Sequence, residues 1–375
     1  MNHPSPVSPL QALRKDWFFW TLLLLLVGLT AVAPAKVSGY PALVDWPTIA
    51  TLAGLLVLTK GVELSGYLHH LGERLLVLMP TERALALFLV LATALLSMLL
   101  TNDVALFVVV PLTVSLRIAV AAPLPITRLI IFEALAANAG SALTPIGNPQ
   151  NLFLWQQSQL PFHSFVVALL PLFLLLMVPL LVLSAAAFSS RALQIHQLVA
   201  LPPVRRHLLW LSLALYLPFL ILTELHHAPA ALLVLLAIFL LGFRKVLARV
   251  DWGLILVFVL MFIDLRLLAQ LDLVRDVIGN IGLAQPQRLY LAGIAASQLI
   301  SNVPAAILLA EYTRDWRLTA YAVNVGGFGF MLGSLANIIA LRMTHQRSAW
   351  LVFHLYSLPF LLVTGGLVYL WLFVW

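Results

Sequence analysis

The sequence predicts an all-α polytopic membrane protein made of two inverted-topology repeats, each with a re-entrant helical hairpin and a broken transmembrane helix. Composition is the first observation. Of 375 residues, 62% are apolar and 9% are charged, which leaves too little polar surface for a water-soluble globule. The second is a series of apolar runs about 20 residues long, enough to cross a hydrocarbon core of roughly 30 Å. The third is a set of polar motifs that recurs in the second half of the chain.

Charge and cysteine content exclude several classes of protein. The net charge is +7, but the basic residues lie between apolar runs and form no continuous stripe, so we expect no nucleic-acid partner. The chain has no cysteine, which removes disulfides and thiolate chemistry and fits a bacterial inner membrane. Gly-x-Ser-x-Gly and His-Glu-x-x-His motifs are absent, so we predict no enzyme, no catalytic residue and no cofactor.

The apolar runs, read against helix breakers, predict nine membrane crossings. They lie near residues 17–35, 46–64, 128–155, 162–188, 207–223, 229–243, 251–268, 318–342 and 350–373. Two further apolar segments, 83–118 and 288–312, are interrupted by Thr101-Asn102-Asp103 and by Ser301-Asn302-Val303-Pro304. We predict that each of these segments is a hairpin that enters and leaves on one side.

The first run is preceded by Arg14 and Lys15, so a cleaved signal peptide is an alternative to a retained helix. Its length favours the retained helix, because the apolar core of a signal peptide is shorter. The predicted organisation is an N-terminal helix in 1–40, a first transport repeat in 41–190, linking transmembrane helices in 191–249 and an inverted second repeat in 250–375.

The distribution of basic residues predicts a cytoplasmic N-terminus. With that orientation, fourteen Lys and Arg residues fall in loops on the cytoplasmic side and six fall on the other side. Trp46 and Trp252 begin predicted crossings, where an amphipathic ring suits the membrane interface. Both signals indicate the same placement of the segments.

The internal repeat is visible when the second half of the chain is compared with the first. Three motifs recur in the same order: Val44-Asp45-Trp46 as Val250-Asp251-Trp252, Ser97-x3-Thr101-Asn102 as Ser297-x3-Ser301-Asn302, and Asn138-x-Gly140-x6-Gly147-x3-Asn151 as Asn324-x-Gly326-x6-Gly333-x3-Asn337. Five predicted crossings separate the first copy from the second, so the copies should point in opposite directions through the membrane. Inverted repeats with interrupted helices are typical of secondary transporters, whose site lies where the repeats meet.

Asparagine is scarce, and its distribution marks the interruptions. Seven of the nine asparagines lie in the motifs: Asn102, Asn138, Asn148, Asn151, Asn302, Asn324 and Asn337. Broken backbone at membrane depth is tolerated only where it is buried in protein or lines a wet cavity. Two interpretations stay open: the amides join helices by hydrogen bonds, or they line a binding site beside helix ends that attract ions.

The motifs resemble the ion transporter superfamily, which includes citrate and dicarboxylate carriers, arsenite permeases and sodium/proton antiporters. The resemblance covers nearly the whole chain and is most specific in "TPIGNPQN", which follows an upstream "TND". It implies that hairpin tips and broken helices meet at the bilayer midplane. It also implies a sodium site at Ser97, Thr101, Asn102 and Gly140, with a symmetry mate at the second tip.

This sequence departs from the sodium-coupled pattern at both tips. Asp103 and Val303 stand where the sodium-coupled carriers have Thr, which puts a two-sodium arrangement in doubt and makes proton coupling an alternative. The predicted substrate- and ion-binding residues are Ser97, Thr101, Asn102, Asp103, Asn138, Gly140, Thr144, Gly147, Asn148, Asn151, Ser297, Ser301, Asn302, Asn324, Gly326, Ser334 and Asn337.

Among the ionisable residues, Asp103 is the carboxylate that the sequence singles out. Asp103 should exchange a proton, with a helix cap as the alternative. Lys60 and Glu63 form an ion pair or a coupling pathway, and Glu133 either couples or pairs with a basic residue. Other residues have structural placements: Asp45 and Asp251 as helix caps, Asp264 and Arg266 at the membrane interface, and His69, His70, His226 and His227 in solvated loops.

These observations predict a secondary active transporter that moves a small anion across the bacterial inner membrane by alternating access, coupled to protons or sodium. A cation/proton antiporter of the same fold is the alternative, and a channel or an intramembrane enzyme is more remote. The expected partners are the lipid bilayer and a small anionic substrate, and a homodimer is left open.

Overall fold

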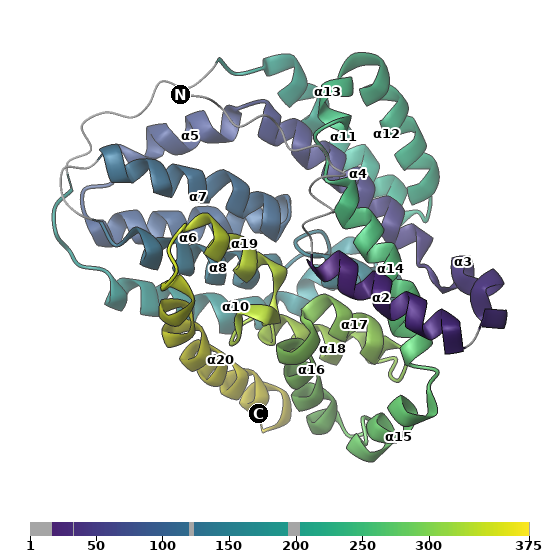
Figure 1. Cartoon of the computed structure of the whole chain (residues 1–375). Coiled ribbons are helices and arrows are strands. Elements are labelled where there is room, and N and C mark those ends of the chain that lie inside the picture. Colours follow the sequence, from purple (N-terminus) through teal and green to yellow (C-terminus); the bar gives the residue numbers. More distant parts are fainter. Residues whose placement is uncertain (1–16, 33, 120–123, 194–202, 375) are drawn as a thin grey trace. The chain divides into compact units, whose positions relative to one another are not determined.

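The computed structural model of the chain describes residues 17–32, 34–119, 124–193 and 203–374 (Figure 1). These residues are overwhelmingly helical and form no β-strand, apart from one isolated bridge between Thr81 and Ala192. The predicted all-α class is confirmed. Contacts divide the chain into two compact units, one of Met1–Lys60 with Ala214–Ile281 and the other of Gly61–Leu213 with Gly282–Trp375. The predicted boundaries follow the repeat instead, and they stay a prediction.

The first unit contains the N-terminal helix, linking helices and the first long helix of each repeat. Its elements are α2 (Trp17–Val32), η1 (Pro34–Gly39), α3 (Tyr40–Leu43), α4 (Trp46–Leu64) up to Lys60, α11 (Arg206–Glu224) from Ala214, α12 (Ala228–Gly242), α13 (Arg244–Leu247), α14 (Trp252–Leu268) and α15 (Asp272–Ile281). Helix α14 packs against α2 and α3. The two aspartates predicted as caps begin α4 and α14. Asp45 Oδ1 accepts from the Thr48 amide at 3.0 Å, and Asp251 Oδ1 from the Leu254 amide at 3.2 Å.

The second unit holds both hairpins and both broken helices. Its elements are α5 (Tyr67–Leu76), α6 (Glu82–Leu99), α7 (Asn102–Ala119), α8 (Ile126–Ser141), α9 (Pro149–Ser158), α10 (Phe162–Ala187), α16 (Pro286–Ile300), α17 (Asn302–Ala310), α18 (Trp316–Val325), η2 (Met331–Gly333), α19 (Leu335–Met343) and α20 (Ala349–Phe373). Helix α8 is its centre, because α6, α7, α10, α19 and α20 all pack against it.

Several helices are long and apolar enough to span a membrane. Among the described residues there are five, Trp46–Leu64, Glu82–Leu99, Phe162–Ala187, Arg206–Glu224 and Ala349–Phe373, or up to seven if each of two bent helix pairs is one span. The predicted helical membrane segments are therefore confirmed. The number of nine crossings and the opposite orientation of the repeats stay predictions.

The predicted interruptions are real breaks in the helices. The first hairpin turns between α6 and α7 at residues 100–101, and the second turns at Ser301, whose backbone has φ 74° and ψ 156°. This conformation is sterically strained for a residue with a side chain. The broken helices are interrupted at residues 142–148 and 326–334. Asn148 starts the second half of the first one, since its side chain accepts from the Asn151 amide at 2.9 Å.

Two short helices, α5 and α15, occupy stretches in which the sequence predicts no membrane crossing. Each has ten residues and follows the end of a long helix of its repeat. Their apolar residues recur at helical spacing among charged ones and form no continuous run, so a search for spanning segments passes over them. His69 and His70 therefore lie half-buried in α5 rather than in a solvated loop, and burial lowers the pKa of His69. His226 and His227 are exposed as predicted.

Candidate functional site

The breaks of the two broken helices are joined by hydrogen bonds between asparagine side chains of the second unit. Asn138 Nδ2 donates to Asn337 Oδ1 at 2.8 Å, and Asn324 Nδ2 donates to Asn151 Oδ1 at 2.7 Å. In the sequence repeat, Asn138 corresponds to Asn324 and Asn151 to Asn337. The two bonds are therefore the same bond made twice, once in each direction between the repeats.

The same asparagines also satisfy carbonyl groups that the helix breaks release. Asn151 Nδ2 donates to the carbonyl oxygens of Ala142 at 3.1 Å and Thr144 at 3.2 Å. In the second repeat, Asn337 Nδ2 donates to the Gly327 carbonyl at 2.9 Å. Because the last carbonyls of a helix have no partner within it, these amides provide the bonds that an unbroken helix would have made.

Glycines bring the first arm of each hairpin against the broken helix of its repeat. A Cβ atom at Gly140 would lie 2.4 Å from the Ala94 carbonyl oxygen and 2.6 Å from Ser97 Oγ, and one at Gly326 would lie 2.6 Å from Ser297 Oγ. Within the breaks, a Cβ at Gly147 or Gly333 would meet a backbone carbonyl at 2.4 or 2.6 Å. The glycine spacing thus serves close backbone approach inside the unit.

The first hairpin tip is bonded to the first break. The Asn102 amide donates to the Gly147 carbonyl at 2.8 Å, and Thr144 Oγ1 donates to the Met98 carbonyl at 2.6 Å. Thr101 Oγ1 accepts from the Val104 amide at 3.3 Å and caps α7. The predicted residues of the first repeat are thereby brought together at one place.

The second tip offers a hydroxyl that the described part of the chain leaves without a hydrogen bond. Ser301 Oγ is buried and has no partner among these residues. Asn302 is also buried. Its Nδ2 lies beside the second break, 3.2 Å from the position that a Cβ atom would take at Gly327. A buried, unsatisfied hydroxyl on strained backbone is a feature that folding alone does not explain.

Two glutamines belong to the site although the sequence reading did not single them out. Gln298 Nε2 donates to the carbonyls of Gly326 at 2.7 Å and Phe328 at 3.0 Å, so it holds the second break. Gln150 Nε2 donates to Asn324 Oδ1 at 3.4 Å, while its buried Oε1 has no hydrogen bond to any described residue. Their counterparts in the repeat are Met98 and Ala336, so a search for repeated polar residues could not find them.

The site contains few charged groups. Four helices, α7, α9, α17 and α19, begin at the tips and breaks, and helix N-termini attract negative charge. The segments 97–103, 138–151, 297–302 and 324–337 contain no Lys or Arg and a single carboxylate, Asp103. Asp103 lies half-buried in the first turn of α7, where its amide donates to Asn102 Oδ1 at 3.1 Å.

The other ionisable residues fall outside this cluster. Glu133 is wholly buried in α8 and accepts a hydrogen bond from the Thr113 hydroxyl, so its partner in the structure is a hydroxyl and not a basic residue. Asp264 was predicted at the membrane interface, but it is 0% exposed, inside the first unit near the end of α14. Arg266 is half-buried and donates to the Leu43 carbonyl at 2.7 Å. The ion pair of Lys60 with Glu63 stays a prediction.

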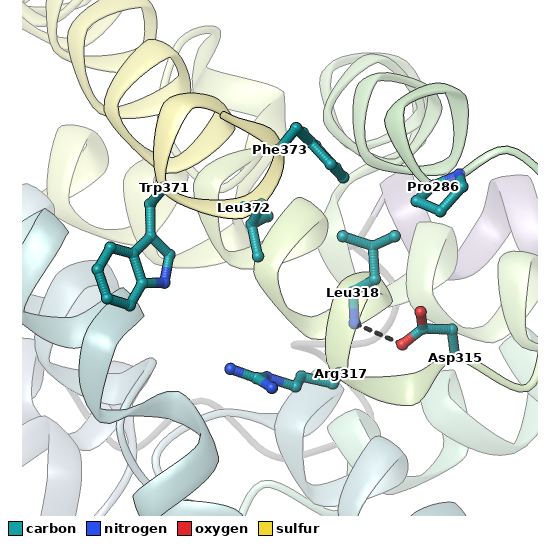
Figure 2. A pocket seen from close by; sticks show the side chains of 7 residues that line it. All are labelled: Pro286, Asp315, Arg317, Leu318, Trp371, Leu372 and Phe373. Atoms are coloured by element: carbon teal, nitrogen blue, oxygen red, sulfur yellow. Dashed lines mark hydrogen bonds between the residues drawn. The ribbon is translucent and has the colours of Figure 1, made fainter. Parts of the chain in front are cut away.

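A separate cavity of about 410 Å³ lies where α16 and α18 begin and α20 ends (Figure 2). Asp315 caps α18 there, because its Oδ1 accepts from the Leu318 amide at 2.9 Å. Figure 2 shows Arg317 turned away from Asp315, on the side of Trp371. None of the predicted binding residues lines this cavity.

Comparison with known families identifies the kind of protein. Residues 10–315 match the citrate transporter family, CitMHS. The chain belongs to the citrate transporter family. This membership and the apolar helices together make the chain a membrane transporter, as the sequence motifs predicted.

Individual relatives agree with this assignment. The inner membrane protein YbiR of Escherichia coli is 49% identical over 353 residues, which cover 94% of both chains. The transporter MJ0456 of Methanocaldococcus jannaschii is 30% identical over 94% of this chain and 93% of its own length. The silicon efflux transporter LSI3 of rice is 35% identical over 130 residues, or 35% of this chain and 26% of that protein.

The close approach at Gly140 gives a first prediction. Gly140→Ala should destabilise the protein by about 1–3 kcal/mol, because the new methyl group meets the Ala94 backbone oxygen, which cannot move alone. Thermal unfolding of the purified protein in detergent measures the effect. Gly366→Ala in α20 is the control, since nothing lies within 4 Å of its Cβ position. Equal unfolding temperatures for the two variants would contradict the packing argument.

Proposed function

We propose that this chain is a secondary active transporter that moves a small anion across the bacterial inner membrane by alternating access, with protons or sodium as the coupling ion. The observation that carries the proposal is the meeting of two broken helices and two hairpin tips within one unit. Broken helices at a repeat interface are the usual binding sites of secondary transporters. The location rests on the relative YbiR, which is named as an inner membrane protein, and the cytoplasmic N-terminus rests on the distribution of basic residues.

The chemistry of the site favours a small anion that is bound by neutral donors. Helix N-termini provide backbone N–H groups, and the Ser301 hydroxyl, which makes no hydrogen bond to a described residue, can donate one as well. No basic side chain lies in the four segments, so a ligand with several negative charges would meet little compensating charge. The proposed substrate class is therefore a small anion of low charge.

The first tip and break also suit a hard cation. Ser97, Thr101, Asn102 and Gly140 present only oxygen ligands, from hydroxyl, amide and carbonyl groups, which sodium prefers. The second tip has Val303 and Pro304 after its asparagine, where the first tip has the carboxylate oxygens of Asp103. These residues support at most one such site, at the first repeat.

A cation/proton antiporter is the second candidate. The observation that favours it is that Asp103 is the one charged side chain in the four segments and is acidic. A carboxylate at membrane depth can bind a proton or a metal cation in turn. We propose no enzymatic role, in keeping with the transport function named for the family.

A binding experiment tests the site at Ser301. Ser301→Ala should weaken ligand binding about tenfold or more, the loss of one hydrogen bond to an anion, while the unfolding temperature stays unchanged because that hydroxyl makes no bond in the described protein. The ligand is first found by a thermal-shift screen of citrate, succinate, phosphate, sulfate and silicate. Ser184→Ala in α10 is the matched control, since its Oγ bonds only the Leu180 carbonyl.

The amide network makes a contrasting prediction. Asn151→Ala and Asn337→Ala should each lower both ligand affinity and the unfolding temperature, because each amide also holds broken backbone. Normal affinity in both variants, together with normal affinity in Ser301→Ala, would reject the site.

Asp103→Asn separates ion coupling from substrate binding. We expect the variant to exchange substrate across proteoliposome membranes while it loses uptake driven by an ion gradient, because the amide cannot take up a proton. Uptake is measured separately with a pH gradient and with a sodium gradient. If both gradients drive the variant as well as the wild type, Asp103 is not a coupling residue.

A further inference from the structure

The buried carboxyl of Glu133 has a role that the cluster of breaks and tips does not explain. Glu133 is 0% exposed in α8, a helix in which every residue from 129 to 141 is buried. It precedes Asn138 by five residues, which places it about 7 Å along the helix from the amide network. A carboxyl so deep within an apolar core is costly if it is ionised and unpaired.

Only one of the two carboxyl oxygens of Glu133 makes a hydrogen bond to a described residue. The Thr113 hydroxyl of α7 donates to Oε1, whereas Oε2 is buried and has no hydrogen-bond partner in the described ranges. The first oxygen is thus held, and the second is buried without a donor among the described residues. Such surroundings accept the neutral carboxyl, with its proton on Oε2, far better than the carboxylate.

The helices around Glu133, α8 included, carry ten other charged or titratable groups. They are Glu82 and Arg83 of α6, Asp103 and Arg117 of α7, Arg128 of α8 itself, His163 of α10, Arg342 of α19, and His354, Tyr356 and Tyr369 of α20. Several are bonded elsewhere: Glu82 accepts from Ser189, Arg83 donates to the Phe188 carbonyl, and Arg128 donates to the Ala187 carbonyl. The side chain of Arg117 lies outside the described residues.

We propose that Glu133 is a proton-binding site that couples the hairpin helix α7 to the broken helix α8 during transport. The bond from Thr113 joins the two helices, and α7 and α8 lead to the first tip and the first break. Loss of the proton from Oε2 to water leaves a carboxylate that must be hydrated or paired, so the carboxylate favours a state in which the two helices separate at this point. The proton returns when they pack again.

This inference rests on the proposed transport function, but its first test does not. Infrared spectroscopy of the purified protein at neutral pH should show the carbonyl stretch of a protonated carboxyl, shifted when the protein is labelled with ¹³C-glutamate. The band should be absent in Glu133→Gln. It should persist in Asp264→Asn, which removes the other carboxyl that is wholly buried within the described ranges, on α14. Loss of the band in Asp264→Asn alone would overturn the proposal.

Thr113→Val provides a second variant if Glu133→Gln fails to fold. Removing the hydroxyl takes away a donor that stabilises the carboxylate, so the pH at which the band disappears should rise by about one unit. A midpoint unchanged from that of the wild type would show that Thr113 and Glu133 do not act together, and would overturn the coupling of α7 to α8.

Transport distinguishes the coupling role from simple burial. In proteoliposomes loaded with a pH-sensitive dye, the wild type should move protons when citrate, succinate, phosphate, sulfate or silicate is added, whichever shifts the unfolding temperature. Glu133→Gln should exchange the solute without moving protons. Proton movement as in the wild type would overturn the coupling role. If the wild type carries none of these five solutes, the transport proposal and the coupling role fail together, while the infrared band still reports protonation.

Discussion

The constraint on which the second unit depends is the need to satisfy backbone polar groups where helices break inside an apolar protein. An unpaired carbonyl or amide in such surroundings costs several kcal/mol, so a break survives only with a replacement partner. Here the replacements are side-chain amides: Asn151 and Asn337 bond carbonyls of their own breaks, and Gln298 bonds those of residues 326 and 328. Close packing at Gly326 belongs to the same arrangement, because it brings Ser297, the neighbour of Gln298, against the second break.

The same constraint divides the polar residues by use. Most side-chain amides of the broken helices form hydrogen bonds that join the repeats, which agrees with the interpretation of amides as links between helices. What remains for a ligand is a smaller set of groups, including the Ser301 hydroxyl, Gln150 Oε1 and the starts of α7, α9, α17 and α19. Structural and binding roles therefore lie in one place but on different atoms.

Much of this arrangement could be predicted from the sequence, because interruption motifs are rare in apolar runs and the repeat shows each of them twice. The hairpins, the breaks and the Asp45 and Asp251 caps follow from such signals. Residues without a polar counterpart could not be found this way, as Gln150 and Gln298 show. The burial of Asp264 could not be predicted either, because it depends on the helices that pack around α14. Helices α5 and α15 were missed for another reason: their apolar faces are too narrow to be recognised as membrane spans.

The reciprocal asparagine bonds also bear on how the chain is made. Asn151 can form its bond only after Asn324, 173 residues later in the chain, has been synthesised, and Asn138 only after Asn337, 199 residues later. At roughly 5 to 20 residues per second, the ribosome needs about 10 to 40 s to deliver the partner. Until then Asn138 Nδ2 and Asn151 Oδ1 in the first half lack these partners, so the bonds between the repeats form only late in the synthesis of the chain.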